Sequence, residues 1–574
     1  IARDASEKKK HEPLPVLTVK IADVNSLLAV AKKVAAAVGV DGDEFDQNVS
    51  IIDTIEGINK KEPLGLVFRS NGEDFNDPLF IAPINDLEKF SLPNIPFKFS
   101  KIADGKFRAA VSPALSFIGY QKEGYAVIVP ETSSAPIPAN PKALLADLDK
   151  YKLGFKVELT NTTYDAVSQI LAPLIMFASM TDPDAAENLQ NTIELCEPFF
   201  DEYKNVILGY AVDAKTLDVV GEVKVEASKD SKILSKIIDF GKNRKTNFAG
   251  IKTKNTPVLY ANDTELFTSG YYPDPDTYKE VIDILEKQFA LIAKGALDSI
   301  KEMAESEAEE KNAEIAVNSL QKIILSLYKQ DKIDYAAWLD TEGTGFFALN
   351  VSEAGELDKF FDAVINVVKA RHAENDDSRK ELEKFLADNL KRNYKTIAGY
   401  SISSLKIPFA EIAQQHGASD FPKLKIGNTY NLFAAISDKK AVVLAGGVDA
   451  DKTEAALKTA LEATADAATP KQPTMLFDLQ AVGQLLNKIG VEAFAKEEQD
   501  KEAVKDFLAI INNVGNTSKI TVTNEVKDST IFTSLKIDGS VIFAIAKLVK
   551  TAREYDGKII PAQEVIDITV PEDE

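Results

Sequence analysis

Internal similarity limits the possible folds of this chain, because one strand-to-helix junction recurs along it. Residues 17–21 alternate between apolar and polar side chains and lead into an apolar helical pattern, as residues 475–479 do before the pattern 482–489. A third copy joins residues 155–159 to a pattern that begins at Tyr164. A period of two predicts strands, and apolar residues at i, i+3 and i+4 predict helices. The recurrence predicts a protein built from copies of one α+β unit.

A second element is predicted four times, namely a hairpin whose outgoing strand leads into a helix. Each copy has two strands followed by a helix. The strand pairs are 64–68 with 79–82, 206–212 with 219–225, 335–339 with 346–351, and 520–526 with 531–537. The helices that follow them are 86 onward, 232–240, 357–368 and 541–549, in the same order. Polar or glycine-containing turns such as Asn71-Gly72 close antiparallel pairs. Since one hairpin cannot bury its own apolar face, we expect helices to cover one face of a mainly antiparallel sheet.

The repeated elements predict an α+β fold of tandem modules in two pseudo-equivalent halves. The expected organisation is a polar N-terminal segment 1–14, modules 15–150, 151–250, 251–470 (with helical insertions) and 471–558, and an acidic C-terminal tail 559–574. Glycine-rich βαβ turns are not found in the sequence, which disfavours a doubly wound nucleotide-binding fold.

The charge of the chain limits its partners. Asp and Glu number 89 and Lys and Arg 67, for a formal charge of −22. Such a surface repels nucleic acid and anionic lipid headgroups, so no nucleic-acid partner is expected. It favours solubility, and weak divalent-cation binding is the alternative interpretation. No apolar run reaches the roughly 18 residues of a transmembrane helix, and residues 170–180, which contain Pro173, are interpreted as a core helix.

The N-terminus and the cysteine content favour export. The chain begins at Ile1 and continues with a polar, lysine-containing run, as expected after removal of a leader. Cys196 is the only cysteine, so an intramolecular disulfide is excluded. This fits an exported bacterial protein that is stabilised by packing alone, although an ordinary cytosolic protein has the same cysteine usage.

The sequence contains no convincing catalytic or metal-binding motif. His11, His372 and His416 are isolated, and none belongs to a zinc-binding pattern. The run from Ser403 to Lys406 matches the S-x-x-K pattern of serine acyl enzymes, but its alternation predicts extended chain rather than the helix that this chemistry needs. Trp338 lies in a predicted hairpin and is expected in the core. We therefore expect no enzyme, no cofactor and no catalytic, cofactor-binding or metal-ligating residue.

The junction at residues 17–24, its copies and the hairpin–helix units resemble large repeat-containing exported proteins of unknown function from bacteria of the planctomycete type. The resemblance covers most of the chain. It implies an extracellular or cell-envelope location, and it implies neither an activity nor functional residues.

These observations predict a non-enzymatic exported or cell-surface scaffold whose repeated modules bind one another or other surface proteins. A first alternative is a carrier of an apolar ligand, such as a lipid, in the cell envelope, suggested by the apolar helical pattern 171–177. A second alternative is a hydrolase that uses dispersed carboxylates.

Overall fold

The computed structural model describes most of the chain. The described residues are 14–37, 42–53, 55–70, 77–90, 98–112, 115–133, 136–181, 183–229, 231–242, 245–246, 259–266, 268–272, 275–372, 376–409, 411, 427, 429–437, 441–462, 467–468, 475–495, 498–515 and 518–555. His11, His416, the predicted N-terminal segment to residue 13 and the predicted tail lie outside them.

The strands of the described residues include the predicted alternating runs and others that were not predicted. They are β1 Leu14–Ile21, β2 Leu64–Ser70, β3 Asp77–Ala82, β4 Ser100–Ala103, β5 Lys106–Ser112, β6 Leu115–Lys122, β7 Tyr125–Pro130, β8 Leu153–Glu158, β9 Tyr203–Val212, β10 Val219–Ala227, β11 Lys245–Thr246, β12 Leu259–Leu266, β13 Lys332–Leu339, β14 Gly345–Asn350, β15 Leu390–Ile397, β16 Tyr400–Pro408, β17 Thr429–Ser437, β18 Ala441–Gly447, β19 Ala467–Ala468, β20 Met475–Asp478, β21 Lys519–Lys527 and β22 Thr530–Ile537.

The helices lie between groups of strands. They are α1 Val24–Ala37, α2 Gly42–Asp53, η1 Pro141–Leu148, α3 Asn161–Thr181, α4 Pro183–Glu202, α5 Leu234–Lys242, η2 Thr268–Tyr271, α6 Pro275–Met303, α7 Glu307–Tyr328, α8 Glu356–Arg371, α9 Asp376–Asn389, α11 Ala450–Glu462, α12 Leu479–Ile489, η3 Val491–Ala493, α13 Glu498–Asn512 and α14 Gly539–Glu554, where η marks a 3₁₀ helix.

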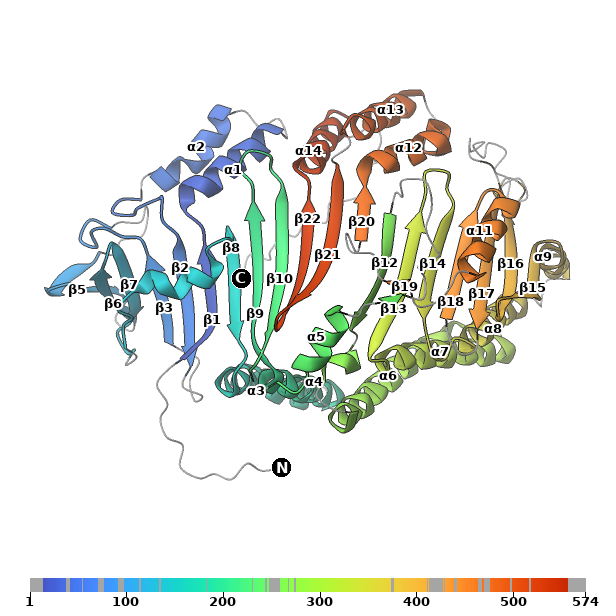
Figure 1. Cartoon of the computed structure of the whole chain (residues 1–574), viewed down its shortest axis with the longest axis horizontal. Coiled ribbons are helices and arrows are strands. Elements are labelled where there is room, and N and C mark those ends of the chain that lie inside the picture. Colours follow the sequence, from blue (N-terminus) through green and yellow to red (C-terminus); the bar gives the residue numbers. More distant parts are fainter. Residues whose placement is uncertain are drawn as a thin grey trace.

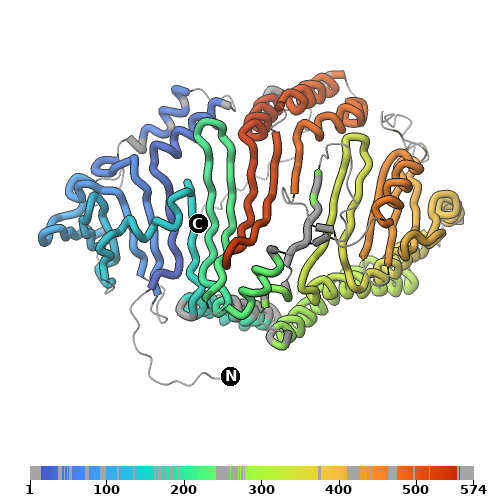
Figure 2. The backbone as a smooth tube through the Cα atoms, viewed as in Figure 1, coloured from blue at the N-terminus to red at the C-terminus, as the bar shows by residue number. Residues whose placement is uncertain are grey.

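One antiparallel sheet contains all these strands except β11 and β19, which pair with each other. Its spatial order, read from the strand pairings, is β4-β5-β6-β7-β3-β2-β1-β8-β9-β10-β22-β21-β20-β12-β13-β14-β18-β17-β16-β15. The sheet extends along the long axis of the molecule (Figures 1 and 2). The prediction of a mixed α+β fold with an antiparallel sheet is confirmed.

The sheet crosses the predicted module boundaries. β1 pairs with β8 across the boundary at residue 150, and β12 pairs with β20 across the boundary at residue 470. The centre of the sheet is the pairing of β10 with β22, from Val219–Ile537 to Glu226–Thr530. The described parts of the predicted modules 15–150, 151–250, 251–470 and 471–558 therefore contribute to one sheet.

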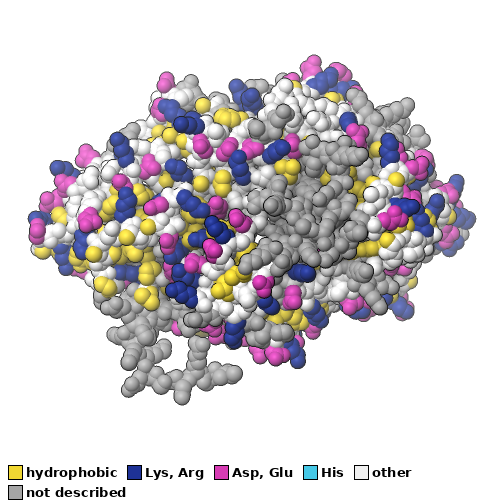
Figure 3. Space-filling model, viewed as in Figure 1, with side chains coloured by type: hydrophobic (Ala, Val, Ile, Leu, Met, Phe, Trp, Pro, Cys, Tyr) yellow, Lys and Arg dark blue, Asp and Glu magenta, His cyan; other side chains and the backbone are white. Residues whose placement is uncertain are grey.

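The two faces of the sheet differ in their side chains, and β10 shows this most clearly. Glu222 and Lys224 lie on the face that carries η1 and α11, which is turned toward the viewer in Figure 1 and is called the front face. Gly221 and Val223 lie on the opposite, back face. In Figure 3 the front face carries Lys, Arg, Asp and Glu side chains of both signs among its described residues. Alternation of this kind is expected for an antiparallel sheet with one solvated face.

Two helices pack on the front face. Leu145 of η1 is fully buried above Gly65 of β2, where a Cβ atom would collide with the leucine side chain. Glycine is required there by the close approach of helix and strand. Near the other end of the sheet, Leu457 of α11 is fully buried in a cluster with Trp338 and Phe433. The prediction that Trp338 is a core residue is confirmed, since it is 6% exposed.

Other helices lie toward the ends of the strands and pack on the back face. Ile233 and Ile237, at the start of α5, contact Val225 and Ile531 at one end of the central strands. At the opposite strand ends, α12 packs on Leu339 of β13. α1, α2 and α12–α14 follow the upper strand ends in Figure 1, and α3, α4, α6 and α7 follow the lower ends.

Two sequence-based expectations are wrong. The helix predicted from Asp86 onward is not formed, because Leu87, Glu88 and Lys89 make a turn and Leu87 inserts its side chain into the core. The predicted core helix 170–180 belongs to α3, but Met176 is 65% exposed and Thr163 is the only buried side chain among those of α3 that the structure describes. For the side chains of this segment that the structure describes, apolar composition therefore does not correspond to burial.

Candidate functional site

The back face of β14, β18, β17 and β16 forms an apolar floor. Phe347 of β14 lies opposite Leu444 of β18, Leu444 lies opposite Ala434 of β17, and Ala434 lies opposite Ser403 of β16. Leu432 follows on the same face of β17, two residues from Ala434. Cross-strand neighbours on one face lie about 5 Å apart, so these side chains form a continuous surface.

Helices α8 and α9 form the roof over this floor. The roof side chains are spaced as expected for one face of a helix, and they are Phe361, Val364, Ile365 and Val368 of α8 with Leu382, Phe385 and Leu386 of α9. α8 is held in turn by α7, since Glu356 at its start contacts Ser319 and Arg371 at its end contacts Glu309. The position of the roof is thus set by a helix that does not line the site.

A cavity of about 700 Å³ lies between floor and roof. Among its described lining residues there is no Asp, Glu or Lys, and nearly all of their lining atoms are apolar. Four lining side chains remain 39–44% exposed, namely Phe347, Val364, Val368 and Leu432. Solvent-sized molecules therefore reach the interior. Cavities of this size and character are typical of small-molecule sites.

One charged group borders the cavity, and it is neutralised by its neighbours. Arg392 of β15 lies 2.8 Å from an Asp358 oxygen and 2.9 Å from an Asp362 oxygen, and it donates a hydrogen bond of 3.0 Å to the Ser403 hydroxyl. Two carboxylates from α8 thus compensate one guanidinium. Asn393 also bonds Ser403, which leaves this polar cluster satisfied within the protein.

Tyr430 adds a neutral phenol to the lining. Burial raises the pKa of Tyr430 above its usual value, so the hydroxyl keeps its proton at neutral pH. The hydroxyl lies 3.4 Å from the carbonyl oxygen of Gly343. The cavity therefore presents almost no charge to a ligand.

Ser403, His372 and Cys196 lie in three different elements of the fold. Ser403 lies in β16, as the predicted extended chain requires, and its hydroxyl is bonded to Arg392 and Asn393. His372 is the C-cap of α8, and its Nδ1 lies 2.9 Å from the Val368 carbonyl oxygen. Cys196 lies in α4. Among the described residues, no three His, Cys, Asp or Glu side chains gather in a way that could hold a metal ion.

A second hollow of about 460 Å³ lies between α13 and α14. Its lining includes Asn513, Ser540, Phe543 and Lys547, so polar and apolar groups are mixed. In the part of the chain that the structure describes, no helix is both long enough and apolar enough to cross a bilayer.

The sequence contains one signal of the cavity, in β18. The run Ala-Val-Val-Leu-Ala-Gly-Gly of β18 is apolar on both faces, unlike the alternating β10. Strands of this kind are covered on both sides. α11 covers the front face of β18, and the cavity with its roof covers the back. Comparison with protein-family models, curated proteins and solved structures found no match.

Proposed function

We propose that this protein binds the hydrocarbon part of an apolar ligand, such as a lipid, in the cavity beneath α8 and α9. The proposal rests on one observation, an apolar cavity of about 700 Å³ with lining side chains that remain partly exposed. Each methylene that leaves water for such a site contributes about 0.8 kcal/mol. A ligand with some ten methylenes gains enough to offset the several kcal/mol that association costs.

The dimensions of the floor fit one lipid chain. The floor crosses four strands, and three interstrand spacings amount to about 14 Å. One leaflet of a bilayer holds acyl chains in about half of its roughly 30 Å hydrocarbon core. The two lengths agree, so the cavity suits one acyl-type chain that lies across the strands.

The polar boundary of the cavity supports a ligand without an inserted anionic headgroup. Arg392 is already paired with Asp358 and Asp362, which leaves no net positive charge to attract a carboxylate or phosphate. A polar headgroup is then better accommodated in solvent at the mouth, beside the exposed Phe347 and Leu432.

Native mass spectrometry and lipid extraction of the protein purified from its source test this proposal. We expect a co-purified hydrocarbon ligand in the unmodified chain and its loss in Ala434→Trp, because the larger side chain fills the floor of the cavity. Ala110→Trp is the matched control, since Ala110 is an exposed residue of β5 far from the cavity. A folded protein that carries no ligand, or an Ala434→Trp variant with undiminished occupancy, contradicts the proposal.

An exported surface scaffold that self-associates is a second proposal. It ranks below ligand binding because both sheet edges are protected in ways that disfavour edge-to-edge pairing. β4 has only four residues, and β15 breaks register between Lys391 and Lys395 with Asn393 at a φ of 46°. Light scattering and electron microscopy, with and without calcium, test assembly, and purely monomeric protein under both conditions excludes it.

We also infer that the two halves of the chain share one folding unit. Outward from the central pair, one side of the sheet runs β10-β9-β8-β1-β2-β3-β7-β6-β5-β4 and the other β22-β21-β20-β12-β13-β14-β18-β17-β16-β15. The ten strands of each half can be numbered in chain order, leaving out β11 and β19. The two series then have the same spatial order, so the two halves have the same connectivity. The agreement of ten strands supports a duplication.

A further inference from the structure

The central strands carry an apolar back face that their own helices leave partly uncovered. Ile531, Leu535 and Ile537 of β22 lie on the back, whereas Lys536 and Ser534 lie on the polar front. Such alternation is typical of a sheet that buries one face. Here that face is only partly buried.

Six large side chains of this back face define what we call the central patch. Each is 36–46% exposed, and they are Ile21, Leu153, Leu208, Tyr210, Val223 and Leu535. They come from the neighbouring strands β1, β8, β9, β10 and β22. Exposed apolar patches of this extent mark ligand or partner sites rather than ordinary surface.

The strand register makes the central patch continuous. Ile21 lies opposite Leu153, Leu153 lies opposite Tyr210, and Gly221 lies between Tyr210 and Leu535. Leu208 and Val223 form a second pair alongside. From β1 to β22 the patch crosses four interstrand spacings, or about 19 Å, which accommodates one acyl chain of about 15 Å.

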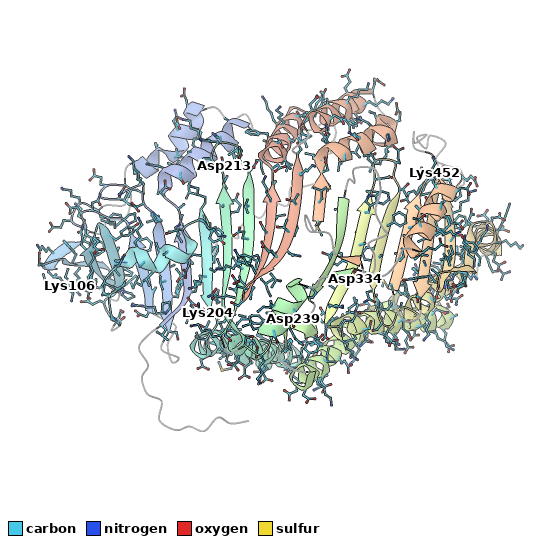
Figure 4. The ribbon with its side chains drawn as sticks, viewed as in Figure 1. Lys106, Lys204, Asp213, Asp239, Asp334 and Lys452 are labelled. Atoms are coloured by element: carbon cyan, nitrogen blue, oxygen red, sulfur yellow. The ribbon has the colours of Figure 1, made fainter. Side chains whose placement is uncertain are left out.

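Helices at both strand ends limit what can cover the central patch. Lys204 and Asp213, labelled in Figure 4, mark the two ends of β9, and Leu208 and Tyr210 lie between them. α5 packs on the back face at one end of the neighbouring strands, and α1 and α14 follow the opposite end. A flexible hydrocarbon chain can lie between such walls, whereas the flat face of a second folded domain is held away by them.

The same row of the back face continues from the central patch to the cavity. From Leu535 it passes through Val522, Met475, Ala261 and Ala337 to Phe347 at the cavity mouth. Five interstrand spacings separate Leu535 from Phe347, or about 24 Å. This exceeds the length of one acyl chain, so a chain in the cavity does not reach the central patch.

We infer that the central patch is a second hydrocarbon site, so that one molecule holds at least two lipid chains, one in the cavity and one on the patch. The inference rests on the proposed function, because it assigns to the patch the ligand class that the cavity takes. It adds a capacity that the cavity alone does not have.

Saturation binding of palmitic acid to delipidated full-length protein, counted by native mass spectrometry, tests the inference. We expect two palmitates per chain in the unmodified protein, one in Leu208→Glu, one in Ala434→Trp and none in the double variant. A glutamate at Leu208 places a charge within the chain-binding surface. Ile102→Glu is the matched control, because Ile102 is 52% exposed on the distant strand β4, and it should still bind two.

The two proposals fail in different ways. If Ala434→Trp loses one palmitate but Leu208→Glu loses none, the second site is refuted and the cavity proposal stands. If Ala434→Trp binds as many palmitates as the unmodified chain, the cavity proposal is refuted. Light scattering of the same samples tests the competing occupant, since a dimer that Leu208→Glu dissociates means that a second copy covers the central patch.

Discussion

The four strands beneath the cavity have a counterpart near the other end of the sheet, and the two regions are filled differently. β14, β18, β17 and β16 carry Phe347, Leu444, Ala434 and Ser403 in one back-face row. Their counterparts β3, β7, β6 and β5, which are adjacent to one another, carry a similar back-face row formed by Phe80, Ile128, Gly119 and Phe107. The first row faces a cavity, whereas in the second Gly119 and Phe107 face packed side chains of the chain itself and only Phe80, which is 38% exposed, does not.

The filling of the second region comes from the segment between β3 and β4. Leu87, Phe90 and Phe99 are at most 7% exposed and cluster with Phe107, and the rings of Phe90 and Phe99 are 6.5 Å apart. The segment between β14 and β15 instead forms α8 and α9. A helix with its side chains is about 10–12 Å wide and stands farther from the sheet than a turn. Similar strands therefore become part of a core or the floor of a cavity according to the segment that crosses them.

The largest expected difference between the two regions is in the cost of removing an aromatic ring. Phe99→Ala should lower the free energy of unfolding by about 3–5 kcal/mol, because it empties a filled core. Phe347→Ala should cost only about 1–2 kcal/mol, because its ring is 44% exposed at the cavity mouth. Urea unfolding of both variants measures this. Equal costs would mean that the two regions are packed alike.

The next largest difference is expected between the ion pair on the front face of β2 and β3 and the polar cluster that borders the cavity. Arg69 and Asp77 are 2.7 Å apart with side chains only 6% and 17% exposed. Asp77→Ala leaves a buried charge unpaired, and we expect a loss of about 3 kcal/mol in the free energy of unfolding. Asp358→Ala should cost about 1 kcal/mol or less, because Arg392 keeps Asp362 and is 21% exposed. Thermal unfolding of the two variants measures both losses. A larger loss of stability in Asp358→Ala than in Asp77→Ala would contradict the comparison.

A single methyl group at corresponding positions sharpens the comparison further. A Cβ at Gly119 would lie 2.9 Å from Leu87 and 3.1 Å from Phe99, so Gly119→Ala should cost about 1–3 kcal/mol by overpacking. Its counterpart, Ala434, already carries a Cβ atom beneath the cavity. Ala434→Gly should cost only about 0.5–1 kcal/mol in urea unfolding. Tolerance of Gly119→Ala without loss would show that the filled region has spare room.

The smallest effect concerns pH and the roof of the cavity. Hydrogen bonding from Lys359 and the charge of Lys322 hold the pKa of Glu356 below its usual value of 4.5. An acid with a lowered folded-state pKa stabilises the fold above its unfolded-state pKa, and this contribution disappears as the pH falls through the folded-state pKa. We expect the loss of about 0.5–1 kcal/mol below pH 4.5 in the unmodified chain and a smaller pH dependence in Glu356→Gln. Unfolding measured from pH 7 to pH 3 checks this, and an unchanged pH dependence in the variant contradicts it.

The elements themselves were largely predictable, because their signals are local. Four hairpins and the junctions at β1, β8 and β20 follow from periods and turn residues within short windows. The helix expected after Asp86 failed because tertiary packing of Leu87 outweighed the local pattern. The cavity was not predicted, and the apolar run that suggested a ligand lies in α3, which does not line the cavity.

Local signals specify which segments alternate, which face of β10 and β22 is apolar and where the four predicted hairpins turn, since each depends on residues a few positions apart. Contacts between distant segments specify that β10 pairs with β22 and that one sheet joins all the predicted modules. They also set the separation of α8 and α9 from the cavity floor and the packing of Leu87 and Phe99 on the filled region. The two kinds of information differ in range. Periodicity is set by neighbouring residues, whereas the size of a cavity depends on the distance between surfaces that segments far apart in the chain bring together.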